Sequence, residues 1–215
     1  MPPVLKIPGH DSPHAREVKL DEIRAALGDC RLCPLGEGRK NIVFGVGSQD
    51  AKVVLVGEAP GAREDEMGIP FVGRAGELLD QMLAGAAHLR REDVYIANVL
   101  KCRPPGNRDP RPEEVQICSP YLREQIRSIW PDVIMTMGNP ATRFILRTEA
   151  GITHLRGKVF KTGHFYLLPT FHPAAVLRDQ LKMPALEEDF RLLGALVRGE
   201  VKLEPPAAPG KETPR

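Results

Sequence analysis

The sequence predicts an α/β protein with three α/β/α layers and a mostly parallel central sheet, and two observations lead to that fold class. Short apolar segments of strand length alternate with longer segments whose apolar residues recur at helical spacing. Residues 52–56 are almost wholly apolar, as expected of a strand buried on both faces. Alternating strands and helices form βαβ units, and ligands bind beyond the carboxyl ends of their parallel strands.

The elements follow in order. Strands are expected at 52–56, 94–99, 132–137 and 165–168. Helices are expected where apolar residues repeat every three or four positions, at 20–27, 78–86, 115–129, 140–146 and 186–197. Pro112 suits the first turn of the third of these helices. The loops after residues 56, 99, 137 and 168 are therefore the places to look for a site.

Composition limits the classes of protein. The chain has 215 residues, of which 42% are hydrophobic and 27% charged, as in an ordinary globular protein. No apolar run is long enough to span a membrane, and residues 1–14 lack the apolar core of a signal peptide, so we expect a cytoplasmic location. Segments 1–15 and 204–215 are rich in proline and poor in large apolar groups, so they are predicted to be disordered around one domain at 16–203.

The four cysteines suggest a metal site. Cys30 and Cys33 form a C-x-x-C pair, and Cys102 and Cys118 follow 69 and then 16 residues later. Four thiolates can hold zinc or a [4Fe–4S] cluster, and the lack of a second C-x-x-C favours the cluster. Two alternatives stay open: Cys118 as a core residue on an apolar helix face, and Cys30 with Cys33 as a redox pair, which is disfavoured because they precede the first βαβ unit.

Candidate ligand-binding residues lie in the loops beyond the strands. Gly57 and Glu58 follow the first strand and offer backbone N–H groups and one carboxylate. Phe71 lies in a glycine-rich turn, where a flat ring could stack on a planar ligand. Asn98 near the second strand end could pair with one donor and one acceptor. His172 after the fourth strand could stabilise an anion beside a helix N-terminus.

A basic loop supplies candidates for phosphate contacts. Residues 101–111 contain four basic side chains and one acid, and Lys101 and Arg103 are the first two of the four. Such loops are also often simply solvated. Arg178, near the end of the segment that follows His172, is a further candidate.

Taken together, these motifs resemble the uracil-DNA glycosylase superfamily, and in particular its family-4, iron–sulfur branch. The resemblance covers residues 20–198, including the loop 57–61, the turn 70–73, the Asn98 strand end, the segment 101–105 and the segment 171–174. It implies a four-stranded parallel sheet between helices, a [4Fe–4S] cluster on Cys30, Cys33, Cys102 and Cys118, and hydrolytic removal of uracil from single- or double-stranded DNA by a monomer. Glu58 stands where the branch with broader base tolerance has an apolar residue.

The resemblance also leads to hypotheses about roles. Phe71 stacks on the flipped base, Asn98 pairs with its O4 and N3–H, and Gly57 and Glu58 contact the ring through their backbone. His172 donates to O2 as negative charge develops there. Separately, Glu58 acts on the sugar cation or the water, with Glu64 and Asp65 as further carboxylate candidates. Lys101, Arg103 and Arg178 contact phosphates, and Leu177 enters the gap in the base stack.

Two other classes of protein remain as alternatives. A non-catalytic iron–sulfur or zinc module for nucleic acid would need the basic loop and the cysteines, but not Glu58, Phe71, Asn98 and His172 together. A nucleotide-binding enzyme would use the first loop for phosphates, and the lack of Gly-x-Gly-x-x-Gly or a P-loop lysine argues against it.

Overall fold

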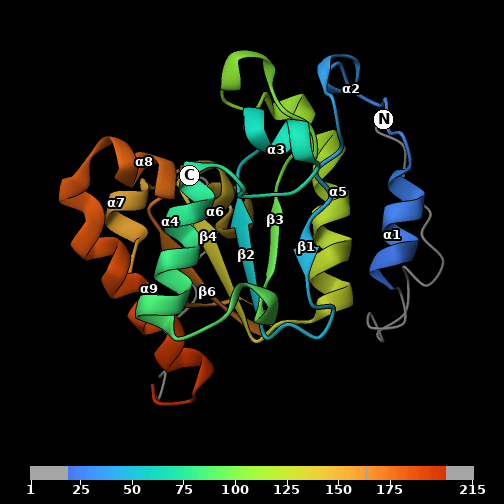
Figure 1. Cartoon of the computed structure of the whole chain (residues 1–215). Coiled ribbons are helices and arrows are strands. Elements are labelled where there is room, and N and C mark those ends of the chain that lie inside the picture. Colours follow the sequence, from blue (N-terminus) through green and yellow to red (C-terminus); the bar gives the residue numbers. More distant parts are fainter. Residues whose placement is uncertain (1–18, 163, 202–215) are drawn as a thin grey trace, which may run out of the picture.

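The computed structural model describes residues 19–162 and 164–201. They form a six-stranded sheet in the order β1-β3-β2-β4-β6-β5 (Figure 1). The inner four strands are parallel to one another: β3 (Tyr95–Asn98), β2 (Val53–Gly57), β4 (Val133–Met137) and β6 (Phe165–Thr170). At the two edges, β1 (Val46–Gly47) and β5 (Phe160–Thr162) pair antiparallel.

The α/β fold class is confirmed, and the number of strands needs correction. The four predicted strands are the parallel centre of the sheet, and the resemblance gave no sign of the two edge strands. Strands of two and three residues are too short to show the period-2 pattern on which strand prediction depends.

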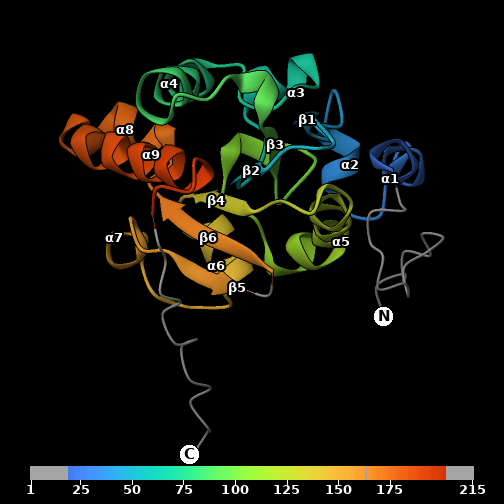
Figure 2. The same cartoon turned by 90° about the horizontal axis from the view of Figure 1, so that it is seen from below.

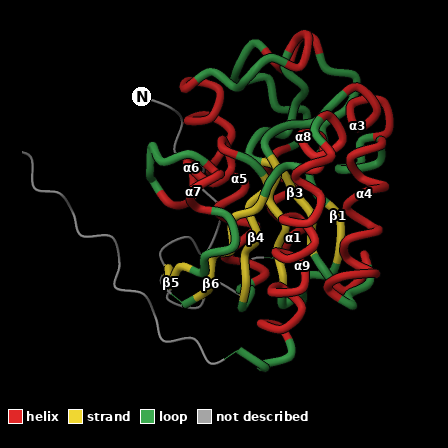
Figure 3. The backbone as a smooth tube through the Cα atoms, turned by 90° about the vertical axis from the view of Figure 1, so that its left-hand side faces the viewer, coloured by secondary structure: helices red, strands yellow, loops and turns green. Residues whose placement is uncertain are grey.

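Helices cover both faces of the sheet, which therefore lies in the middle of three layers (Figures 2 and 3). The residue ranges of the α-helices are α1 Leu20–Leu27, α2 Leu35–Gly38, α3 Ala62–Met67, α4 Arg74–Met82, α5 Pro112–Ile129, α6 Asn139–Leu146, α7 Ile152–Leu155, α8 Pro173–Arg178 and α9 Met183–Val197. In Figure 2, α4, α8 and α9 lie on one side of the sheet, and α5 and α6 lie on the other. Residues 83–87 continue α4 as one wider π-helical turn.

The central strand β2 shows why both faces need helices. Every residue of β2 is buried. Val53 and Leu55 pack into a core shared with α4 and α9, whereas Val54 and Val56 pack into a second core shared with α5 and α6. Alternate side chains of one strand thus enter opposite layers, as its nearly continuous apolar sequence predicted.

The predicted helices are present, and α5 begins at Pro112 as expected. Sequence periodicity did not predict α2, α3 and α7, nor the 3₁₀ turns at 91–93, 105–107 and 180–182, which are all too short to repeat an apolar face. The terminal segments predicted to be disordered, 1–15 and 204–215, lie wholly outside the described residues. No helix within 19–162 or 164–201 is both long and apolar enough to cross a membrane.

The loops after β2 and β3 are joined by an extension of the strand pairing. The Val99 N–H donates to the Gly57 carbonyl at 3.0 Å, and the Leu100 N–H donates to the Glu58 carbonyl at 3.0 Å. Both loops are therefore held at the carboxyl edge of the sheet, near the point where α3 follows β2 (Figure 1).

Candidate active site

The loops at the carboxyl edge of the sheet surround one cavity of about 580 Å³. Five of the predicted site residues line it: Glu58, Phe71, Asn98, His172 and Arg178. They come from segments up to 120 positions apart in the chain, the separation of Glu58 and Arg178. The structure therefore brings together residues that the sequence identified only loop by loop.

Asn98 ends β3 opposite Gly57 of β2. Its side chain is 2% exposed, and its Oδ1 is buried without a hydrogen-bond partner among the described residues. An unpaired buried acceptor is costly, of the order of 1–3 kcal/mol, so such a group commonly has a role in binding. The amide of Asn98 thus offers an unused acceptor at the wall of the cavity.

Phe71 forms the neighbouring wall and has a positive φ of 53°, which is unusual for a bulky residue. Its ring is stacked on His172 with 5.6 Å between ring centroids and 28° between planes. Backbone strain of this kind costs energy and clusters at ligand-binding sites. The turn therefore holds one aromatic face beside the histidine.

Gly57 makes this arrangement possible through close approach. A Cβ at position 57 would lie 2.7 Å from Phe71 Cζ and nearer still to Asn98 Oδ1. Only a residue without a side chain leaves room for the ring and the amide to meet at the end of β2. Gly57 does not itself line the cavity, but it determines the shape of the wall.

His172 precedes α8 as its N-cap residue. Its Nδ1 accepts a hydrogen bond from the Ala174 N–H at 3.1 Å. Burial and the nearby positive charge of Arg178 lower the pKa of His172 to about 4, against a smaller opposite effect of Glu64. At neutral pH the ring is therefore uncharged, with Nδ1 as acceptor and its single proton on Nε2.

The three candidate carboxylates have different surroundings. Glu64 accepts hydrogen bonds from three backbone N–H groups, of Gly61 at 3.1 Å and of Val72 and Gly73 at 3.0 Å each. Its oxygens thus tie the loop after β2 to the Phe71 turn. Asp65 is buried, and its Oδ1 accepts from the Lys40 N–H at 2.9 Å. Both of these carboxylates are used in holding loops.

Of the three candidates, Glu58 lines the cavity and has no such hydrogen bond within the described part of the chain. Burial, with a smaller contribution from the negative charge of Asp109, raises the pKa of Glu58 to about 7. A carboxyl group that titrates near neutrality can change its protonation state during a reaction. This environment supports the choice of Glu58 over Glu64 and Asp65.

The prediction that Lys101 contacts phosphate is wrong, because its side chain is completely buried. Its Nζ donates to the Asn98 carbonyl at 2.9 Å and to Gln125 Oε1 at 2.6 Å. Arg103 is partly exposed, and its Nε donates to Asn107 Oδ1 at 2.8 Å. Arg178 is exposed at the cavity rim, where it remains a candidate for a phosphate contact.

Sequence analysis missed two polar residues that line the cavity, Asn139 and Arg143, and it did not predict that Asn107, Arg108 and Asp109 are the polar residues of the basic loop that reach it. Asn139 directly follows the strand end at Gly138, and this position in the sequence was the available signal. Leu177, predicted to enter the base stack, packs partly buried against the core, whereas Leu181 nearby is 91% exposed.

Three of the four cysteines share a small cluster against which Ala59, a residue of the cavity wall, also packs. Cys102 and Cys118 are buried in a small cluster with Leu35 and Leu100, and Cys33 packs against it. Within the described residues none of the four forms a disulfide, and no three His, Cys, Asp or Glu side chains are grouped as ligands of a single metal ion. Burial raises the pKa of Cys102 to about 11 and that of Cys118 to about 12, so both are thiols unless a cation is bound.

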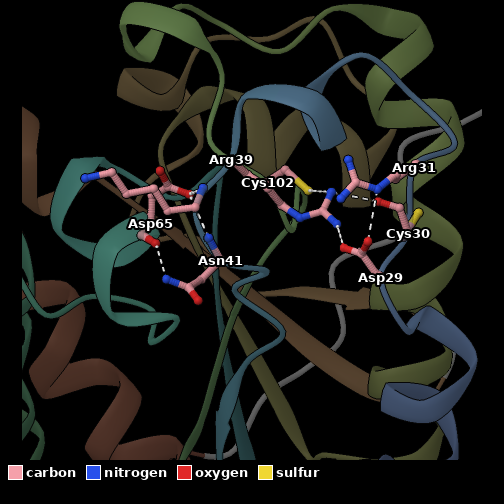
Figure 4. Close-up of polar contacts among 8 residues, drawn as sticks. Asp29, Cys30, Arg31, Arg39, Asn41, Asp65 and Cys102 are labelled. Carbon is pink, nitrogen blue, oxygen red and sulfur yellow. Dashed lines mark hydrogen bonds and ion pairs between the residues drawn. The ribbon is translucent and has the colours of Figure 1, made fainter.

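Nitrogen donors point at two of these sulfurs. The Lys101 backbone N–H donates to Cys118 Sγ at 3.2 Å, and Arg39 Nη1 lies 3.7 Å from Cys102 Sγ. Arg39 also donates to the Cys30 carbonyl at 2.6 Å and forms an ion pair with Asp29. Figure 4 shows Arg39 between Cys102 and the segment 29–31, so one guanidinium links two of the segments that carry cysteines.

Comparison with known proteins identifies the family of the chain. A family model described as the uracil DNA glycosylase superfamily matches residues 44–192. A type-4 uracil-DNA glycosylase of Archaeoglobus fulgidus is 47% identical over 186 residues, covering 82% of this chain and 92% of the relative. The type-4 uracil-DNA glycosylase of Thermotoga maritima is 44% identical over 169 residues, covering 78% and 88%. A type-5 uracil-DNA glycosylase of Pyrobaculum aerophilum is 32% identical over 169 residues, covering 69% and 74%.

Proposed function

The chain belongs to the uracil-DNA glycosylase superfamily and, within it, to the type-4 uracil-DNA glycosylases, and we propose that its cavity receives a uracil flipped out of DNA and releases it by hydrolysis. The product is DNA with an abasic site. Flipping costs a few kcal/mol, which is least for a mispaired or unpaired base.

The observation that carries this proposal is the unpartnered Oδ1 of Asn98. Uracil presents a donor at N3 and an acceptor at O4, so the amide of Asn98 can accept from N3–H through Oδ1 and donate to O4 through Nδ2. Cytosine presents an acceptor at N3 and a donor at its amine, which is the opposite pattern. One amide therefore satisfies uracil and leaves cytosine with two mismatched contacts.

Phe71 and His172 act on the same base from other directions. The Phe71 ring stacks on the face of the flipped uracil. Since Nδ1 of His172 is already occupied, its Nε2–H is the donor that faces developing charge on O2. A neutral histidine also avoids transferring a full proton to a leaving group that departs as an anion.

Glu58 serves the other half of the reaction. Cleavage of the glycosidic bond leaves positive charge on the sugar, and a nearby carboxylate stabilises that charge or orients the attacking water. Its ionised form is required for either task. With a pKa of about 7, the carboxylate is available in an increasing fraction of molecules as the pH rises through neutrality.

Contacts with the DNA backbone are assigned to arginines at and near the cavity. Arg178 and Arg143 line the cavity and hold phosphates, and Arg103, in the loop after β3, remains a further candidate outside the cavity lining. These contacts carry no base information, but they contribute affinity and its salt dependence. That the chain acts as a monomer, on single- or double-stranded DNA and in the cytoplasm, stays a prediction.

Cys30, Cys33, Cys102 and Cys118 would hold a [4Fe–4S] cluster. Four thiols from three segments of the chain, with N–H donors directed at two of the sulfurs, are a donor set that fits thiolate ligation. When bound, the cluster supplies a cross-link between the segment before α2, the loop after β3 and α5. Base removal itself is assigned to the residues of the cavity.

A single incubation tests the proposed function. The protein is mixed with a single-stranded oligonucleotide that contains one uracil, and alkali is then added to cleave abasic sites. The proposal predicts cleavage at the uracil and none in a matched strand with thymine or cytosine at that position. A non-catalytic module would bind the strand without creating an alkali-labile site, and a nucleotide-binding enzyme would do neither.

A further inference from the structure

A fully buried lysine lies directly behind the base-binding wall. Lys101 follows Asn98 by three positions and is 0% exposed. The two acceptors of its Nζ, the Asn98 carbonyl and Gln125 Oε1, are uncharged. Placing an ammonium group in a protein interior is expensive unless its hydrogen bonds are well satisfied. The groups to which the Lys101 ammonium is hydrogen-bonded therefore indicate its role.

On one side, Lys101 is anchored to α5. Gln125 is itself completely buried, and its Nε2 donates to the Phe44 carbonyl and to the Tyr95 hydroxyl, both at 2.9 Å. The three side-chain polar atoms of this network, Lys101 Nζ and Gln125 Oε1 and Nε2, therefore each have a defined partner. A satisfied network of this kind fixes its members in one arrangement.

On the other side, Lys101 holds the peptide that carries the specificity residue. Its Nζ bonds the carbonyl of Asn98, and the next N–H along the chain, that of Val99, bonds the Gly57 carbonyl. The Leu100 N–H then bonds the Glu58 carbonyl. The peptide after Asn98 is thus held between the lysine and the loop that carries Gly57 and Glu58.

We propose that Lys101 is a positioning residue for base recognition: by fixing the carbonyl of Asn98 against α5, it aims the side-chain amide of Asn98 at the edge of the flipped base. This inference rests on the proposed function. Lys101 would act only by holding Asn98 in place, because Lys101 is buried away from the cavity and contacts neither base nor sugar. The alternative is that Lys101 contributes only to the stability of the core.

The test compares two substitutions of Lys101 with a control in the same buried network. Lys101→Met keeps most of the side-chain volume but removes the donors, and Lys101→Gln keeps a shorter, neutral donor. Tyr95→Phe is the control, because it removes a hydroxyl at the far end of the network without touching Asn98. Each protein is assayed for thermal stability, iron content, affinity for abasic product DNA and inhibition by free uracil.

We expect Lys101→Met to weaken inhibition by free uracil, and to slow single-turnover uracil release, by roughly 10²-fold, the scale of a misplaced binding group. Lys101→Gln should lie between Lys101→Met and the wild type. Affinity for abasic DNA should stay unchanged in both, because the rim arginines are untouched. Tyr95→Phe should lower the melting temperature while leaving inhibition by uracil at the wild-type level.

Wild-type inhibition by uracil in a folded Lys101→Met protein would overturn the inference and leave Lys101 as a core residue. If Lys101→Met does not fold, the same criterion applies to Lys101→Gln. A wild-type chain that releases no uracil would overturn the proposed function and this inference together, whereas an active wild type with unaffected Lys101 variants would overturn the inference alone.

Discussion

The base pocket and the cysteine site lie side by side but are built in different ways. The pocket is shaped by Gly57, Asn98 and His172, which lie at or just beyond the ends of β2, β3 and β6, where backbone pairing in the sheet sets their positions. The cysteines come from the chain before α2, the loop after β3 and the helix α5. Side-chain contacts such as that of Arg39 hold those segments together.

The two regions meet in the short segment 98–102, which begins with Asn98 and ends with Cys102. From this difference we infer that the shape of the pocket is set by the sheet, whereas the stability of the cysteine site depends on what its thiols bind. Loss of a cysteine should therefore affect stability most, and loss of a pocket residue should affect the reaction most. The predictions below test that division.

The largest effect is expected from removal of a cluster ligand. Cys118→Ser should abolish iron binding and lower the melting temperature by on the order of 10 °C, because the energy of metal ligation is also folding energy. Ser119→Ala, the adjacent buried position on α5, is the matched control. Iron analysis, absorption near roughly 400 nm for thiolate–iron ligation and thermal melting check this. Stoichiometric zinc in the wild type, or an iron-free variant with wild-type stability, would contradict the cluster.

A methyl group at position 57 should damage the pocket while sparing the cysteine site. In Gly57→Ala the new Cβ meets Phe71 Cζ at 2.7 Å, so the ring and the Asn98 amide must move apart. Single-turnover uracil release should fall by on the order of 10²-fold, with iron content unchanged. Gly85→Ala is the control, since its Cβ would have no neighbour within 4 Å. Equal rates for the two variants would show that the close approach at Gly57 has no function.

The choice of base should depend on the amide of Asn98. Asn98→Asp should weaken uracil release by roughly ten- to a hundredfold, the 1–3 kcal/mol scale of a base-specific contact. It should also allow removal of cytosine, because a carboxylate oxygen replaces the amide donor and can accept a hydrogen bond from the cytosine amine. Rates on otherwise identical uracil and cytosine strands measure both changes. A variant with full uracil activity would place Asn98 outside the base contact.

The smallest effect concerns the pH dependence. Because Glu58 must be ionised and its pKa is about 7, kcat/KM should rise as the pH increases through neutrality. His172, with a pKa of about 4, should add no second ionisation above pH 5. Asp109→Asn removes a negative charge near Glu58, so the midpoint should move to lower pH, by less than about one unit for an exposed neighbour. Asp50→Asn, an exposed acid that does not line the cavity, is the control. A midpoint that does not respond to Asp109→Asn would contradict this assignment.

The sequence predicted the pocket better than its supporting contacts. The strand ends are visible in the apolar pattern, and parallel strands bring their carboxyl ends to one edge, so Asn98 and His172 could be placed together. Lys101 was misplaced because a basic loop looks the same whether its first lysine faces solvent or the core. The loop-holding roles of Glu64 and Asp65 could not be predicted, because they depend on the backbone N–H groups of Val72 and Lys40, which lie in other loops.

The cysteine site was predictable only in part. Spacing favoured four thiolate ligands, but the link made by Arg39 depends on the folded path of residues 29–39. Sequence analysis did not predict the edge strands β1 and β5 or the short helices. Each has too few residues for an apolar repeat to be recognised. Asp109 escaped because its effect on Glu58 acts through space between two loops.

The most direct test of the pocket mechanism compares His172→Ala with Arg178→Ala in one experiment. Single-turnover rates at saturating uracil-DNA and dissociation constants over a range of salt concentrations are measured for both. The account predicts that His172→Ala lowers the rate by roughly 10²- to 10³-fold, the scale of a lost oxyanion donor, with DNA affinity unchanged. Arg178→Ala should weaken binding and reduce its salt dependence while the saturated rate changes little. A His172→Ala protein with the wild-type rate would contradict the account and leave the backbone of the loop after β2 as the remaining stabiliser of the departing uracil anion.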